Sequence, residues 1–412
     1  MRSLIALFAG ATLLLQGCAS SLYSVGAGAS DEATYAAVFP YYVEFCALSE
    51  IRKRPGSAVD IEGGGPGGHS VVYLNGVCRV RTEAYPVIAL CDGPPEPGRG
   101  VGLSVNAHYA NANWTATEGR DFFFHGDLAR GEGLAASSYA RTQARAAADG
   151  VLDGVVFHSE AMVGRPVGMA ERDYRYELSV ATDYAIGFGR DRYCARVPID
   201  RARMDGVVRY LNAVNAPYRS GARVFEWSVL RDNCAHLTHN ALATVGLWPH
   251  WETDRPLLVA AFDFPVPKNE FVNLMRRTND LPIDRPEELL RDDGLRAALI
   301  DNDWIATRPG ALAEAEPAVE DNALYDTKLR LIFYDEAITG HYQQRFDTIF
   351  AEPRYIDLRT NLDHFATLYA NVLARRPGTG SELDRTYYDH IAQESAALQT
   401  TRTTLAKLVG GG

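Results

Sequence analysis

"RDNCAHLTHNAL", residues 231–242, places a cysteine at the start of a predicted helix. Cys234, Leu237, Ala241 and Val245 recur at helical spacing, and Gly246 is suited to end the helix. A thiol in the first helical turn lies beside unsatisfied backbone N–H groups and the positive end of the helix dipole, which favour the thiolate. The stretch therefore predicts a cysteine nucleophile at Cys234.

A thiol nucleophile needs a base within hydrogen-bond reach, and His69 is the candidate. His69 ends the glycine-rich stretch "IEGGGPGGH", residues 61–69, and opens the β-prone run "HSVVYL". The glycines have no accompanying lysine and no following helix, so they do not predict a phosphate loop or a dinucleotide site. Two interpretations stay open. The glycines are a plain linker, or they let the Cys234 helix and a substrate approach His69 closely.

An Asn-Gly dipeptide between two β-prone runs predicts a hairpin over residues 69–82. Antiparallel pairing across this turn would set His69 opposite Thr82, so Thr82 or the neighbouring Glu83 could orient the imidazole. His108, on a later predicted strand, is an equal alternative for this third role.

The chain as a whole predicts an α+β fold. Strands, or irregular connections in the first two cases, are expected at 101–110, 121–128, 152–161, 174–188 and 193–199. Helices are expected at 141–150 and from residue 200, with Asp200 as N-cap. From about residue 265 the pattern becomes helical. The predicted organisation is a signal peptide over 1–17, a tether over 18–35, a thiol-enzyme domain over 36–264 and a helical C-terminal extension over 265–412.

The N-terminal residues are predicted to form a signal sequence that is removed by cleavage. Arg2 precedes the apolar run "LIALFAGATLLL", which is shorter than the roughly 20 residues that span a bilayer. The run ends at "LQGC", which resembles a bacterial lipoprotein signal. That resemblance implies cleavage after Gly17 and acylation of Cys18, and Ala19 implies an outer-membrane lipoprotein facing the periplasm. An ordinary secretory signal is the alternative.

Cysteine usage agrees with export. The chain has six cysteines, so lipidation of Cys18 leaves five and at least one of them unpaired. We expect Cys78 and Cys91, which flank the predicted hairpin, to be bridged or both buried. The formal net charge of −11, without a basic run, argues against a nucleic-acid partner.

Two further motifs carry the resemblance to a known family. "NCAHLTHNAL" is similar to the N-C-x-H motif of the circularly permuted papain-like (NlpC-type) superfamily, which includes lecithin:retinol acyltransferase, and "GGHSVVYL" resembles its histidine strand. The order of histidine before cysteine is the permuted order. The layout of "YCARVPIDRARMDGVVRYLN" before "SVLRDNC" is similar to envelope members that include the lipoprotein intramolecular transacylases.

This resemblance covers roughly residues 60–250 and implies that Cys234 is the nucleophile and His69 the general base. The family's third residue, which orients the histidine, has no clear match in this sequence. The fold it implies is an antiparallel sheet packed on the cysteine-bearing helix, without cofactor or metal.

Three functions follow as alternatives. The first is an envelope acyltransferase or hydrolase that forms a Cys234 thioester with lipid or lipoprotein acyl groups. The second is a cell-wall peptidase or amidase with the same dyad, and the third is a non-catalytic binding or scaffold protein. A zinc site at Cys234, His236 and His239 competes with these, but no companion motif supplies further ligands. His125 and His158 are expected to be ordinary core or loop residues.

Overall fold

The computed structural model describes residues 32–54, 62–63, 68–262, 265–326 and 341–410. Cys18, the signal segment and most of the predicted tether therefore lie outside the described residues. Within those ranges, no helix is long and apolar enough to cross a membrane.

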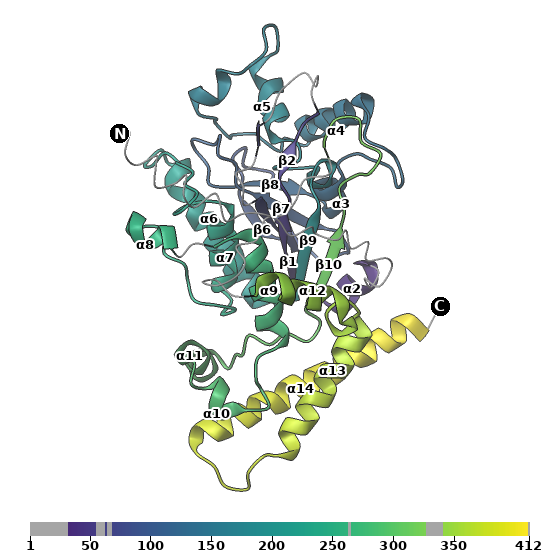
Figure 1. Ribbon diagram of the computed structural model, residues 1–412, viewed down its shortest axis with the longest axis vertical. Helices are drawn as coiled ribbons and strands as arrows, with labels where there is room; N and C mark the ends of the chain where they lie inside the picture. Colours follow the sequence, from purple (N-terminus) through teal and green to yellow (C-terminus); the bar gives the residue numbers. More distant parts are fainter. Residues whose placement is uncertain (1–31, 55–61, 64–67, 263–264, 327–340, 411–412) are drawn as a thin grey trace.

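A six-stranded antiparallel sheet forms the centre of the molecule, in the order β10-β9-β1-β4-β7-β8 (Figure 1). Its strands are β1 (Tyr42–Leu48), β4 (His69–Asn75), β7 (Gly100–Ser104), β8 (Thr115–Glu118), β9 (Arg192–Pro198) and β10 (Leu312–Glu316). Two short pairs lie outside it, β2 (Ile51–Arg52) with β3 (Glu62–Gly63) and β5 (Val77–Arg79) with β6 (Ile88–Leu90). The predicted α+β class is confirmed, as are the strands expected at 69–74 and 193–199.

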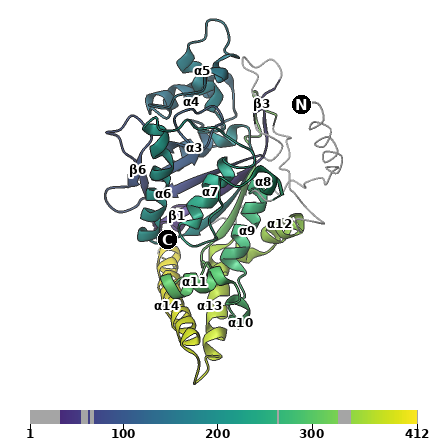
Figure 2. The same ribbon diagram turned by 90° about the vertical axis from the view of Figure 1, so that its left-hand side faces the viewer.

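Helices cover both faces of the sheet, which is why β1 and β4 are buried along their whole length. On one face α7 (Cys234–Ala243) packs against β4, and α9 (Pro267–Asn279) packs against β1 and β9; Figure 2 shows both in front of the strands. On the other face α3 (Arg120–His125) packs on β7. Gly102 makes this approach possible, because a Cβ there would lie 2.1 Å from the Phe123 ring.

The other helices surround these layers. They are α2 (Glu32–Val38), α4 (Ala136–Ala148), α5 (Glu171–Ser179), α6 (Arg201–Arg219), α8 (Leu257–Phe262), α10 (Pro286–Leu289), α11 (Asp293–Asn302), α12 (Tyr342–Ala351), α13 (Leu358–Ala374) and α14 (Glu382–Gly410), with 3-10 turns η2 (Ser159–Met162), η3 (Ile186–Phe188) and η4 (Pro353–Tyr355). Asp200 caps α6 as predicted, by accepting a hydrogen bond from the Arg203 N–H. The long helices α13 and α14 lie side by side at one end of the molecule (Figure 1).

The predicted hairpin over residues 69–82 is wrong. β4 pairs with β1 and β7, whereas β5 pairs with β6. A type I′ turn needs positive φ at both central residues, and only Gly76 has it, at 83°; Asn75 does not. The Gly76 N–H instead donates to the Arg99 carbonyl, and the Cys91 N–H donates to the Gly76 carbonyl. The chain therefore leaves the main sheet at Gly76.

Three segments expected as strands are not strands. Residues 121–128 fall largely in α3, whose three phenylalanines are buried. Residues 174–188 contain the end of α5 and the turn η3, because Tyr174, Glu177 and Leu178 share one buried helical face. Residues 152–161 contain turns, one isolated bridge from Phe157 to Tyr109, and the start of η2. Tertiary packing overrides β-propensity in these short aromatic runs.

Part of the predicted helical extension belongs to the sheet. β10 pairs with β9 over five residues, from Leu312 to Glu316, and α9 packs on the strands that carry the disulfide described below. The C-terminal part is otherwise mainly helical, as expected. The division at residue 264 stays a prediction, and any division has to keep β10 and α9 with the sheet.

Two disulfides leave one thiol free in the described part of the chain. Cys46 is bonded to Cys194 across β1 and β9. Cys78 is bonded to Cys91, which is the first of the two alternatives predicted for this pair, bridged or both buried. Cys234 is the free cysteine. The free thiol of the described residues is therefore the one that the sequence singles out as nucleophile.

The Cys46–Cys194 bridge should contribute most to stability, because it joins residues 148 apart whereas the other bridge joins residues 13 apart. In the chain-entropy account the longer loop stabilises more, with a typical loss of about 2–5 kcal/mol when a native bridge is removed. We expect Cys46→Ala/Cys194→Ala to lower the free energy of unfolding in guanidinium by this amount. The matched control, Cys78→Ala/Cys91→Ala, should lower it less, and an equal or larger loss in the control would contradict the prediction.

Candidate active site

Cys234 is the first residue of α7, as the sequence predicts. Asn233 caps this helix: its side-chain oxygen accepts hydrogen bonds from the Ala235 N–H at 2.9 Å and the His236 N–H at 3.3 Å. The cap fixes the helix start and so fixes where the sulfur lies. Only 7% of Cys234 is exposed, so the thiol is nearly closed off from solvent.

Ser70 of β4 is the main polar neighbour of the sulfur. Burial raises the pKa of the Cys234 thiol, while hydrogen bonds from the Ser70 hydroxyl and N–H, and the charge of Arg190, act in the opposite direction. Burial is the largest of these effects. The sequence expectation of a thiolate favoured by the helix N-terminus is therefore not met: burial outweighs the helix, and the group rests as a thiol.

His69, the first residue of β4, is held by Ser104 at the end of β7. The His69 Nε2 lies 2.9 Å from the Ser104 Oγ, and the Ser104 hydroxyl donates to the Thr182 carbonyl at 2.6 Å. The Thr182 carbonyl also hydrogen-bonds the His69 imidazole, and the Ser104 hydroxyl also hydrogen-bonds the Asp183 carboxyl. The ring is therefore held in a buried polar cluster of Ser104, Thr182 and Asp183.

The imidazole is neutral near neutral pH. Burial, and secondarily the charge of Arg190, lowers the pKa of His69 to about 3. Next to Ser104 lies Asp183, a buried carboxyl that accepts a hydrogen bond from Asn106 at 2.8 Å. Burial raises the pKa of Asp183 to about 6. The site therefore holds a neutral base, a neutral thiol and a carboxyl whose charge changes in the physiological range.

His69 and Cys234 come to the same end of β4 from opposite faces of the sheet. Side chains alternate along a strand, so Ser70 points to α7 and Cys234, while the His69 ring points to the face of Ser104. Among the described contacts, no hydrogen bond joins the imidazole to the thiol. Ser70, adjacent to His69 in the chain, is the connection between them, and the direct contact of thiol and imidazole stays a prediction.

Among the described contacts, Glu83 and His108, two of the sequence candidates for the orienting role, have other partners than His69. Glu83 forms an ion pair with Arg219 at the surface, because the failed hairpin takes it away from β4. The His108 ring stacks on Phe157 at a centroid distance of 6.2 Å. The side chain that does contact the His69 ring is Ser104, which sequence reasoning missed. Only the pairing of β4 with β7 could have pointed to it.

The three residues of the alternative zinc site, Cys234, His236 and His239, do not form a metal site in the described structure. His239 is held by the Glu270 carboxylate at 2.5 Å and the Pro249 carbonyl at 2.9 Å, and its ring stacks on Trp248. Within the described residues, the ligand atoms of Cys234, His236 and His239 do not converge. The three potential ligand residues that do converge there are Glu44, Cys46 and Cys194, whose sulfurs are used in the disulfide.

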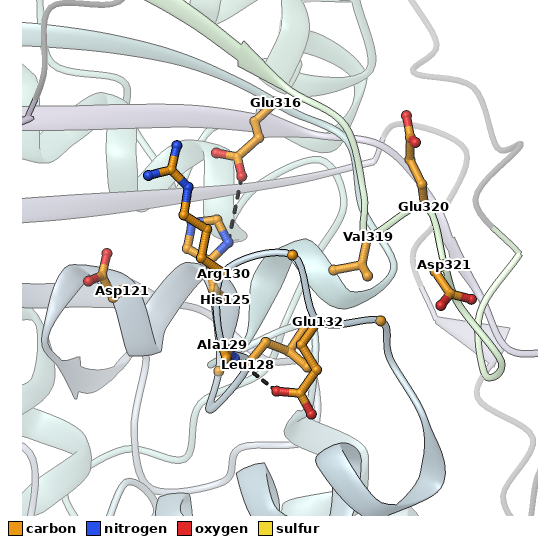
Figure 3. A pocket seen from close by; sticks show the side chains of 13 residues that line it. Asp121, His125, Leu128, Ala129, Arg130, Glu132, Glu316, Val319, Glu320 and Asp321 are labelled. Carbon is orange, nitrogen blue, oxygen red and sulfur yellow. Dashed lines mark hydrogen bonds and ion pairs between the residues drawn. The ribbon is translucent and has the colours of Figure 1, made fainter.

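A cavity of about 720 Å³ lies elsewhere, between α3, the loop that follows it and the segment after β10 (Figure 3). Its charged lining residues are mostly acidic: Asp121, Glu132, Glu316, Glu320 and Asp321, with His125 and Arg130. Two of these carboxylates already have partners, since Glu316 pairs with Arg192 and Glu132 with Arg141. Neither Cys234 nor His69 lines this cavity.

Comparisons with family models, with curated proteins and with solved structures find no match to this chain.

Proposed function

We propose that the protein is a thiol enzyme that transfers or hydrolyses acyl groups through a thioester on Cys234, with His69 as its base and a permuted papain-like arrangement of the two. The observation that carries the proposal is the free thiol of Cys234. In a chain whose other described cysteines are bridged, it stands at a capped helix N-terminus against the strand that His69 opens.

Cys234 and His69 together can account for every bond and proton in the proposed acyl transfer. As substrate binds, the His69 imidazole accepts the thiol proton, and the thiolate attacks the acyl carbonyl. Collapse of the tetrahedral intermediate forms the S–acyl bond and breaks the bond to the leaving group, which takes the proton from the imidazolium. An acceptor hydroxyl, amine or water then attacks the thioester, gives its proton to the imidazole and returns the thiol. Ser104 holds the ring in place throughout.

This step requires the His69 ring or the Cys234 side chain to move, because the two groups lie on opposite faces at rest. Catalytic hydrogen bonds that are long or poorly aligned without substrate often tighten in the substrate complex. Without substrate, the His69 imidazole and the Cys234 thiol are both uncharged. The imidazolium and the thiolate form only when the proton moves from the thiol to the imidazole.

Lipid or lipoprotein acyl groups are the proposed substrates, since a lipid anchor at Cys18 would hold the enzyme beside them at the outer membrane. A cell-wall peptidase or amidase is the alternative with the same dyad. The two are separated by comparing turnover of phospholipid or acyl-ester substrates with turnover of muropeptide amides. We expect the enzyme to release acyl groups from the phospholipid or acyl-ester substrates. Turnover confined to the amides would replace the acyltransferase proposal with the peptidase, and no turnover of either by the full chain would favour the scaffold.

Lipidation of Cys18 has its own test. We expect the mature protein, expressed in a Gram-negative host, to begin at Cys18 with an added diacylglyceryl group, because the short apolar run ends at "LQGC". Mass analysis of the N-terminal peptide measures this, and Cys18→Ser should give protein released from the membrane fraction. An uncleaved or unacylated Cys18 would return the cysteine count to six and remove the membrane anchor from the proposal.

A further inference from the structure

Two neighbouring surface segments expose large apolar side chains to solvent. The first segment is residues 156–167, around η2, and the second is residues 223–231, between α6 and α7. Their exposed apolar residues are Val156, Val163, Val167, Val224, Trp227 and Val229. These six are half of the large hydrophobic side chains that are exposed in the described part of the chain. Exposed apolar residues that are scattered singly are ordinary, whereas a group of them indicates an interaction surface.

Hydrogen bonds hold the two segments side by side. The Ala110 N–H donates to the Val156 carbonyl, and the Phe225 N–H donates to the Ala110 carbonyl, both at 2.8 Å. The His158 Nε2 donates to the Phe225 carbonyl at 2.9 Å. Phe225 is buried and so fixes the second segment to the core. The exposed residues nearest to these bonds and along the second segment, Val156, Val224, Trp227 and Val229, are called the apolar patch.

The patch continues directly into the helix that carries Cys234. Ser228 and Asp232 form an antiparallel bridge with N–H···O distances of 2.7 and 3.1 Å, so Val229 lies in a closed loop just before α7. The side-chain amide of Asn233, which caps α7, donates to the Ser228 and Val229 carbonyls at 3.2 and 2.8 Å. One side chain therefore fixes both the start of α7 and the loop that carries part of the patch.

Exposed arginines accompany the patch. They are Arg165 in the first segment and Arg223 and Arg231 in the second, and among the described residues no ion pair includes them. The carboxylates of the two segments are Glu160 and Glu226. Three arginines against two glutamates give these segments a formal charge of +1, in a chain whose net charge is −11. The sign of this local charge complements a surface of anionic headgroups.

We infer that the apolar patch docks on a lipid bilayer, with its side chains at the boundary of headgroups and acyl chains and the arginines at the headgroup phosphates. Valine side chains leave water when they enter this boundary. Trp227 suits it because an indole ring has an apolar body and a polar N–H. The inference deepens the proposed function, on which it rests, by naming the surface that brings Cys234 to lipid substrates.

The predicted anchor leaves a role for such a surface. Residues 19–31 join Cys18 to α2 and span at most about 45 Å when fully extended. An anchor attached through this length keeps the protein near the bilayer, but it does not select the face that the protein turns toward the lipid. The apolar patch makes that selection, because it is the part of the second segment that leads into α7 and its thiol.

The test is vesicle binding by the mature chain, residues 18–412, with Cys18→Ser. This protein contains every described residue up to the C-terminus and has no lipid anchor. Vesicles of phosphatidylcholine with phosphatidylglycerol are sedimented, and the bound fraction gives a partition coefficient. We expect binding, and we expect Val224→Ser/Trp227→Ser to lower the partition coefficient by at least about tenfold. Binding should weaken at high salt and without phosphatidylglycerol, because both changes reduce the attraction of the arginines.

A matched control makes the result specific. Ile300 in α11 and Leu408 in α14 are 58% and 46% exposed, against 62% for Val224 and 39% for Trp227. Ile300→Ser/Leu408→Ser should therefore change the partition coefficient by less than about twofold if the patch is the docking surface. A second patch variant, Val156→Ser/Val229→Ser, should lower it in the same direction as the first, so the test does not depend on one pair of substitutions folding well.

Three results would overturn the inference. They are no binding by the unaltered mature chain, an equal loss in the control and the patch variants, and a dimer that does not bind vesicles and that Val224→Ser/Trp227→Ser dissociates. The last result would make a second copy of this chain the occupant. Vesicle binding needs no catalysis, so its failure is distinct from that of the proposed function. A chain that binds vesicles through the patch without acyl turnover would keep the surface and lose the function, and turnover without binding would do the reverse.

Discussion

Replacement of Cys234 by alanine is expected to reduce acyl transfer to the uncatalysed level, a loss of more than about 10⁴-fold, while the fold stays intact. The nucleophile has no substitute, because the other described cysteines are in disulfides. Alanine leaves the Asn233 cap and the α7–β4 contact in place, so the thermal midpoint should change little. Turnover of a chromogenic acyl ester by the full chain, with circular dichroism for the fold, measures both.

Cys234→Ser is the companion variant. A serine hydroxyl fits the same place but has no thiolate, and the rate should fall nearly as far as with alanine. If either variant keeps more than about a tenth of the activity, Cys234 is not the nucleophile. Loss of activity together with loss of the fold would instead give Cys234 a structural role.

His69→Ala should lower the rate by about 10²–10⁴-fold, the usual contribution of a general base. The pH profile of the unaltered enzyme is diagnostic, because the pKa of His69 is lowered to about 3 and that of Cys234 is raised. The neutral imidazole is present at every pH above about 4, so the profile should show no loss between pH 7 and pH 5 that is due to this histidine. The rate should rise toward alkaline pH as the thiolate becomes more accessible.

Two controls accompany this variant. His108→Ala removes a half-buried histidine that stacks on Phe157, and Glu83→Gln removes a surface carboxylate paired with Arg219. Neither should alter the rate by more than about twofold. Ser104→Ala, by contrast, frees the His69 ring and should lower the rate without abolishing it. A rate in His69→Ala equal to that of the His108→Ala control would remove His69 from the mechanism.

Local signals in the sequence predicted the elements that carry the site. The helical spacing from Cys234 predicts α7, and the β-branched run after His69 predicts β4. These elements follow from short-range physics: capping, periodicity and side-chain branching. Cys78 and Cys91 were predicted to be bridged or both buried, because they flank the predicted hairpin, and they are bridged.

The errors arise where partners are distant in the chain. Asn75-Gly76 is a good hairpin signal, yet the partners of β4 are β1 and β7, and no local pattern identifies them. The misplacement of Glu83 follows directly from that error. Ser104 is an ordinary residue in the sequence, and only the pairing of β4 with β7 brings it to His69.

The most direct test of the central claim is the mass of Cys234 after the full chain has been incubated with a Gram-negative envelope lipid extract and quenched in acid. The account predicts a fatty-acyl increment on the peptide that contains Cys234, released by neutral hydroxylamine as a thioester should be, and absent from Cys234→Ala. A Cys234 that stays unmodified while acyl products accumulate, or that is found in a disulfide in the active protein, would contradict the account.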